Sequence, residues 1–132
     1  MNDPVRRLLA GLFGNQGERT AARFLKRQGY RILTQGYRIR RGEIDLIALD
    51  AGRIVFVEVK TRRSGSPAEA VTLEKQRNLT RAALHFLKRH HLLDQPSRFD
   101  VVAIVWPDDS REPTIQHFRN AFPAANLPRS SF

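Results

Sequence analysis

Residues 42–49 read Gly-Glu-Ile-Asp-Leu-Ile-Ala-Leu, and residues 55–63 read Val-Phe-Val-Glu-Val-Lys-Thr-Arg-Arg. Both segments are short and largely apolar, and isoleucine and valine, which favour strands, are prominent in them. Between them Asp-Ala-Gly at 50–52 is typical of a tight turn. We therefore predict a β-hairpin with strands at 43–49 and 53–61.

Four ionisable side chains interrupt these apolar strands. Because strand side chains alternate between faces, Glu43 and Asp45 share a face of the first strand. By the same alternation Glu58 and Lys60 share a face of the second, where Asp45 can meet them. Charges among apolar residues are costly unless they are paired or bound to a cation. Either the acids hold a hard divalent ion and Lys60 acts on water or phosphate, or Lys60 only neutralises the acids in an ion-pair cluster.

Hydrophobic periodicity predicts the other elements. In the first helix Ala21, Ala22 and Leu25 form an apolar stripe, and Glu18 lies on the same stripe. Gly36 is expected to break the strand region that follows. In chain order we predict a helix at 17–28, strands at 30–33, 37–39, 43–49 and 53–61, a helix at 72–90, a strand at 99–106 and an edge strand at 114–118.

The length of 132 residues suits a single domain. We expect a flexible basic arm at 1–15, the domain at 16–122 and a flexible tail at 123–132. The N-terminal apolar run is too short for a secretory signal, so we expect a cytoplasmic protein. No apolar run approaches the roughly 20 residues of a membrane span, which excludes integral membrane association.

The charge balance indicates a polyanionic partner. Twenty-three basic residues against 13 acidic ones give a net charge of +10, which favours nucleic acid first and an anionic membrane surface second. The chain contains no cysteine, so disulfides, iron–sulfur sites and cysteine nucleophiles are excluded.

The hairpin motif resembles the signature of the PD-(D/E)xK, or restriction-endonuclease-like, nuclease superfamily. More closely, the chain resembles the YraN family of small bacterial proteins, which are related to archaeal Holliday-junction resolvases. The likeness runs from about Gly17 to Trp106 and includes Gln16-Gly17-Glu18, Lys75-Gln76 and Arg98-Phe99-Asp100-Val101-Val102. The resemblance implies an α/β domain with a mixed central β-sheet flanked by helices.

The resemblance also implies roles for single residues. Asp45 and Glu58 would be ligands of Mg²⁺ or Mn²⁺, Lys60 would be the catalytic lysine, and Glu18 would complete the metal site. For Glu18 the alternative is an acid favoured near a helix N-terminus by the helix dipole. The superfamily's Pro-Asp pair is Ile44-Asp45 here, so the match depends on the acids and the lysine.

Further residues around the motif are candidates for supporting roles. Glu43 would support the metal ligands or pair with Arg41 or Arg62, and Gln76 would orient the site from the long helix. Basic residues beside the site are expected either to contact phosphate or to form a solvated rim: Arg38, Arg40, Arg41, Arg62, Arg63 and Lys75.

We therefore expect a metal-dependent endonuclease that hydrolyses phosphodiester bonds in branched or otherwise structured DNA. A homodimer is compatible with this expectation, because resolvases place two symmetric cuts. The main alternative is a catalytically weak nucleic-acid-binding or adaptor protein that keeps the fold. A third reading is a basic partner of an anionic membrane or a ribonucleoprotein.

Overall fold

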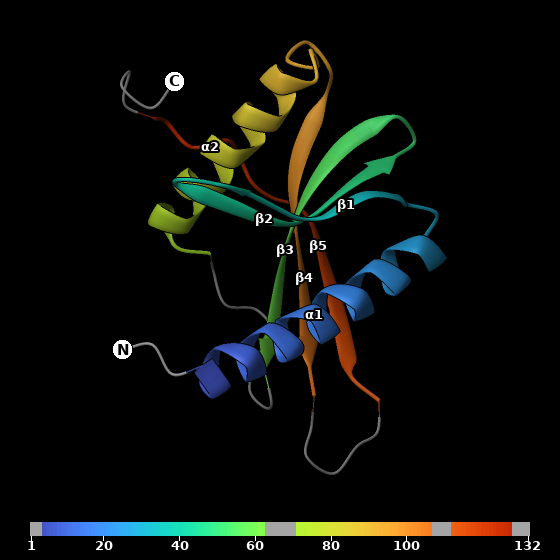
Figure 1. Cartoon of the computed structure of the whole chain (residues 1–132). Coiled ribbons are helices and arrows are strands. Elements are labelled where there is room, and N and C mark those ends of the chain that lie inside the picture. The colour runs from blue at the N-terminus through green and yellow to red at the C-terminus, as the bar shows by residue number, and fades with distance from the viewer. Residues whose placement is uncertain (1–3, 63–70, 107–111, 128–132) are drawn as a thin grey trace.

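The computed structural model describes residues 4–62, 71–106 and 112–127, with side chains described from residue 16 onward. Figure 1 shows the arrangement of the helices and strands in this part of the chain. In chain order they are α1 (Pro4–Arg27), β1 (Arg31–Ile39), β2 (Gly42–Asp50), β3 (Arg53–Arg62), α2 (Leu73–Arg89), β4 (Ser97–Val105) and β5 (Thr114–Phe122).

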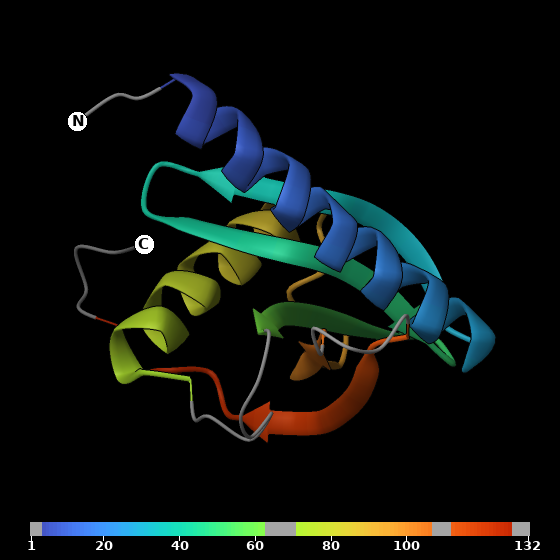
Figure 2. The same ribbon diagram turned by 90° about the horizontal axis from the view of Figure 1, so that it is seen from below.

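The five strands form one sheet in the order β1-β2-β3-β4-β5. All neighbouring strands are antiparallel except β3 and β4, which run parallel because α2 carries the chain back to the starting edge. The sheet is therefore mixed, as expected, and α1 and α2 lie on its opposite faces (Figures 1 and 2). This α/β architecture is consistent with a restriction-endonuclease-like fold.

Each helix packs against one face of the sheet and covers a separate apolar core. Under α1, the predicted stripe of Ala21, Ala22 and Leu25 packs on Leu46, Val57 and neighbouring residues of the sheet. Under α2, a second core is built from side chains of the helix and the opposite sheet face: Ile44, Ile47, Ile54, Phe56, Leu79, Ala82, Ala83, Phe86, Leu87 and Phe99. Because both faces are covered, a charged side chain in the central strands has little access to water except at their ends.

The β2–β3 hairpin forms as predicted. Its turn residues Ala51 and Gly52 both have positive φ angles, +50° and +84°, and Asp50 pairs directly with Arg53. Two consecutive positive φ values are typical of the type I′ turn, which matches the twist of the flanking strands.

The predicted break at Gly36 is wrong. Strand β1 runs continuously from Arg31 to Ile39, because pairing with β2 continues on both sides of the glycine. Gly36 keeps a φ of +74°, and the irregularity appears instead as a register shift between Ile32 and Thr34. A glycine can adopt this backbone conformation at little cost, so the strand bends without ending.

A threonine caps the start of the long helix. Thr72 precedes α2 and its hydroxyl accepts a hydrogen bond from the backbone N–H of Lys75 at 3.1 Å. His90 lies at the other end. The Thr72 cap fixes the first turn of α2 close to the carboxyl end of β3.

Other boundaries differ from the prediction. Helix α1 begins at Pro4, inside the segment expected to be an arm, and β5 continues to Phe122, whose ring stacks on Phe99. Beyond β5 the backbone N–H of Ala125 donates to the hydroxyl of Thr80, so the tail starts by fastening to α2. Residues 107–111, between β4 and β5, lie outside the described residues. No helix in the described part of the chain is both long and apolar enough to cross a membrane.

Candidate active site

The candidate site lies where β2 and β3 separate. The ladder between these strands runs from the turn to the pair Leu46–Val57, and beyond it β2 diverges. Asp45 is the next residue of β2, and its Oδ2 accepts a hydrogen bond from the backbone N–H of Val59 at 2.8 Å. The Asp45 carboxylate thus accepts the Val59 N–H that a backbone carbonyl of β2 would otherwise accept in a regular ladder. This hydrogen bond holds the carboxylate in the gap between the two strands.

Glu58 occupies the neighbouring position of β3. Its side chain is only 9% exposed and lies on the same face of β3 as Phe56, the face covered by α2. Its Oε1 lies 3.6 Å from Nζ of Lys75, and its Oε2 is buried without a hydrogen-bond partner among the described residues. An unpartnered buried carboxylate oxygen is costly, so this position favours a proton or a cation.

The pKa values report the same tendency. Burial, and then the charge of Asp45, raise the pKa of Glu58 from 4.5 to about 7, although Lys75 and Lys60 oppose the shift. Burial also raises the pKa of Asp45, in spite of the hydrogen bond from Val59. Two acids that resist ionisation side by side form a site at which added positive charge is stabilising.

Glu18 approaches this pair from α1. Its pKa is raised by partial burial and then by the charges of Asp45 and Glu43. The approach is possible because Gly17 packs against β3, where a Cβ atom would lie 2.6 Å from Cγ2 of Thr61. Glu18 is thus positioned by a close helix–sheet contact and acts electrostatically on Asp45.

Two of the supporting residues form contacts that the sequence does not predict. Glu43 forms an ion pair with Arg38 at 3.2 Å, not with Arg41 or Arg62. Gln76 donates through Nε2 to the backbone carbonyl of Val71 at 2.9 Å, so its amide fastens the start of α2.

The two lysines relate to Glu58 differently. Lys60 is half-buried and lowers the pKa of Glu58 through its charge, whereas Lys75 is the cation within ion-pair distance. From the sequence, Lys75 is expected either to contact phosphate or to lie in a solvated rim, and its contact with Glu58 is not predicted. The topology could have indicated this contact, because the helix that connects the parallel strands β3 and β4 begins near the end of β3.

The donor set fits a hard divalent cation, because its groups are carboxylate oxygens and one of them, Oε2 of Glu58, is buried and unpartnered. No three carboxylate or imidazole side chains of the described residues are arranged so that they coordinate one ion together. Asp45 and Glu58 are the pair from which such a site would be built.

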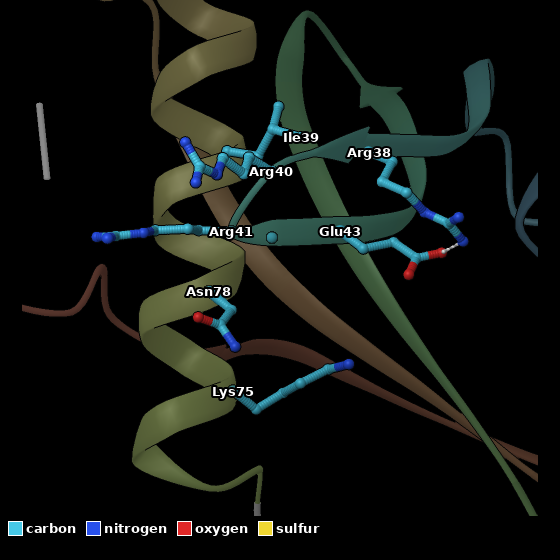
Figure 3. A pocket seen from close by; sticks show the side chains of 8 residues that line it. Arg38, Ile39, Arg40, Arg41, Glu43, Lys75 and Asn78 are labelled. Atoms are coloured by element: carbon cyan, nitrogen blue, oxygen red, sulfur yellow. Dashed lines mark hydrogen bonds and ion pairs between the residues drawn. The ribbon is translucent and has the colours of Figure 1, made fainter. Parts of the chain in front are cut away.

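Basic side chains line a pocket beside the acids (Figure 3). The pocket has a volume of about 300 Å³ and lies between the β1–β2 turn region and α2. Its lining residues are Arg38, Ile39, Arg40, Arg41, Gly42, Glu43, Lys75 and Asn78. Four of the expected phosphate-binding residues are therefore gathered in one place. Arg62 lies at the end of β3 and is half-buried, and Arg63 is outside the described residues.

A second polar cluster lies on the other face of the sheet, near the end of α1. Asp100 is fully buried. Its carboxylate accepts a hydrogen bond from the Arg98 side chain at 2.9 Å and another from the backbone N–H of Asn120 at 2.9 Å. It also pairs with Nε2 of His117 at 2.8 Å. Arg98 also reaches Asp50. These partners satisfy the buried carboxylate, and the hydrogen bond to Asn120 spans the β4–β5 register shift, so the cluster stabilises the sheet.

The fold and the site together define a class of protein: an α/β domain with a mixed five-stranded sheet that holds a buried acid, a half-buried acid and a lysine where its central strands separate. A family profile described as "Uncharacterised protein family UPF0102" matches residues 17–104. The chain belongs to this family, the YraN family, as its hairpin motif indicates.

Curated relatives agree with this assignment. A UPF0102 protein of Trichlorobacter lovleyi is 49% identical over 116 residues, which cover 85% of this chain and 91% of the relative. A UPF0102 protein of Pelobacter propionicus is 49% identical over 117 residues, with 85% and 83% covered. One of Caldicellulosiruptor saccharolyticus is 46% identical over 112 residues, with 83% and 95% covered. The likeness therefore extends over nearly the whole length of these relatives.

Proposed function

We propose that this protein is an endonuclease that depends on Mg²⁺ or Mn²⁺ and hydrolyses phosphodiester bonds in branched or otherwise structured DNA. The observation that carries the proposal is the adjacent pair of half-buried Asp45 and buried Glu58, with a buried carboxylate oxygen that has no partner among the described residues, beside a pocket lined by arginines. Two adjacent acids that are largely withdrawn from water are costly for a protein that only binds nucleic acid, whereas they are useful for holding a metal next to a phosphate.

Asp45 and Glu58 would hold the metal, and Glu18 would assist from α1. When bound there, the metal would polarise the phosphodiester and lower the pKa of a bound water. The Val59 N–H keeps Asp45 oriented before any cation arrives, which reduces the cost of assembling the site.

Lys60 has the role of placing the attacking water and offsetting the charge that develops on the phosphate. Its ammonium acts on Glu58 without forming an ion pair within 4 Å among the described residues, so it is available to a phosphate oxygen. Arg38, Arg40 and Arg41 hold the substrate in the ground state, since they line the adjacent pocket.

The proposal extends to assembly and location. Two symmetric cuts in a branched substrate require two sites, so we propose that the active form is a homodimer. We place the protein in the cytoplasm, where such DNA intermediates occur in a bacterial cell.

The test is a cleavage assay with labelled junctions, flaps, duplexes and single strands, each with Mg²⁺, Mn²⁺ or EDTA. The wild type should cut at least one branched substrate in the presence of metal. Lys60→Met should lower cleavage by on the order of 100-fold or more, the effect of losing one preorganised charge, while DNA affinity changes only a few-fold.

Calorimetric titration with Mn²⁺ provides the control that does not depend on cleavage. Asp45→Asn and Glu58→Gln should each abolish Mn²⁺ binding, because each removes an anionic oxygen ligand. If DNA is bound but never cut, and both variants behave like the wild type toward Mn²⁺, the adaptor alternative is correct.

A further inference from the structure

We propose that one face of α2, together with the β1–β2 hairpin that packs on it, is a track for about six base pairs of the DNA arm beside the scissile phosphate. The inference rests on the proposed function and specifies where the substrate lies. The track begins at Lys75, beside Glu58, and ends at Arg89.

Polar and basic side chains recur along this face at helical spacing. Lys75, Asn78, His85 and Arg89 are three, seven and four residues apart, which places them on one stripe along the helix. Asn78 is half-buried and the other three are exposed. The stripe borders the apolar face of α2, so it runs beside the sheet rather than on the outermost surface of the helix.

The β1–β2 hairpin forms the second wall of the track. Gly42 lies directly against α2, since a Cβ atom there would be 2.2 Å from the backbone oxygen of Asn78 and 3.3 Å from Cβ of Ala82. Further along the helix the Tyr37 hydroxyl forms a hydrogen bond with Nδ1 of His85. The hairpin therefore follows α2 between these two contacts, and Figure 1 shows the hairpin beside the helix.

Two hollows lie along this line. The pocket of about 300 Å³ lies between the hairpin turn and the first two turns of α2, and in Figure 3 Arg40 and Arg41 extend over the helix while Lys75 extends toward the sheet. A second hollow of about 440 Å³ is lined by His85, Lys88 and Arg89. Both hollows lie where the stripe is exposed.

The charge along the track suits a phosphate backbone. Arg40, Arg41, Lys75 and Arg89 are exposed cations, and the acid within the pocket, Glu43, is already paired with Arg38. Helix α2 contains one acidic residue, Glu74, which lies in its first turn. Exposed cations in series beside a groove are the usual means by which proteins fix the position of a nucleic-acid strand.

The length of the stripe sets the number of base pairs. Fourteen residues separate Lys75 from Arg89, and at 1.5 Å per residue they span about 21 Å. A duplex rises about 3.4 Å per base pair, so the track covers about six base pairs. Because Lys75 contacts Glu58, one end of the arm is held at the acids and the other near the C-terminus of α2.

The absence of cysteine in the chain allows a direct test. The variant Arg89→Cys, labelled with an iron chelate that cleaves DNA locally, should produce scars in a junction arm about six base pairs from the protein's own Mn²⁺-dependent cut. Arg27→Cys carries the same label at the end of α1 and is the matched control, for which no localised scars are expected.

The two proposals fail in distinguishable ways. If the unlabelled protein cuts DNA but the Arg89 label gives no scars, or scars as scattered as those of the Arg27 label, the track is wrong and the proposed nuclease stands. If no metal-dependent cut is found but the Arg89 label still marks one arm next to the branch, the track is right and the nuclease proposal is wrong.

Discussion

Glu58 is the side chain whose ionisation the fold resists most clearly. In the unfolded chain it ionises near 4.5, whereas in the folded protein its pKa is about 7. Between these values the folded state keeps a proton that the unfolded state has lost. The free energy of unfolding that this group contributes is therefore largest below about pH 4.5, and it is lost as the pH rises through 7.

Glu58→Gln should remove this dependence. Measured by urea unfolding in EDTA, the variant should gain stability relative to the wild type between pH 5 and pH 8, by on the order of 2–3 kcal/mol. The difference follows from the loss of a buried charge next to Asp45. Mn²⁺ at pH 8 should stabilise the wild type and not the variant. Parallel pH profiles for the two proteins would contradict the assignment.

The positions of some site residues relative to one another could be predicted from the sequence, and those of others could not. Asp45, Glu58 and Lys60 could be grouped because strand alternation and one short turn determine their relative positions. The Lys75 contact with Glu58 was not predictable in this way, because it depends on where a helix returns after a crossover. Local periodicity gives the face of an element but not its distance from another element.

Among the elements, the β1–β2 hairpin meets the backbone of α2 closely at Gly42. Gly42→Ala would place a methyl group against the backbone oxygen of Asn78, which cannot rotate away as a side chain can. We expect a loss of about 1–3 kcal/mol in thermal or urea unfolding, as is usual for overpacked contacts. DNA affinity should fall as well, because the hairpin carries Arg40 and Arg41.

A second substitution checks the cause of this loss. Asn78→Ala shortens the side chain but leaves the backbone oxygen in place, so the double variant should be no more stable than Gly42→Ala alone. Recovery of stability in the double variant would show that the Asn78 side chain, and not the helix backbone, limits the approach.

Both edge strands extend further than the sequence predicts. Gly36 was read as a break, since glycine is depleted in strands, yet pairing with β2 continues past it. Strand β5 was expected to end at Phe118, but it runs to Phe122, held by stacking on Phe99. In both cases a neighbouring strand extends the element, and the sequence of one strand does not specify its partner.

For the whole molecule, the net charge of +10 should dominate binding. If four phosphates are contacted, the affinity for duplex DNA should follow log salt with a slope of about −3.6 and fall roughly 100-fold between 50 and 200 mM salt. Fluorescence anisotropy at a series of salt concentrations measures the slope. An affinity that does not depend on salt would contradict a nucleic-acid partner.

The strands follow one another in the sheet in the same order as in the chain, and this order has a kinetic consequence. Strands β1, β2 and β3 form a meander that closes through two turns of two residues each, and short loops close within about a microsecond. Pairing of β3 with β4 must wait for the longer crossover through α2, which makes it the slower event. Asp45 and Glu58 both belong to the early meander, so their mutual repulsion is met before α2 brings Lys75 beside them. The refolding rate at neutral pH should therefore depend on the charges of Asp45 and Glu58, which repel each other until Lys75 is in place.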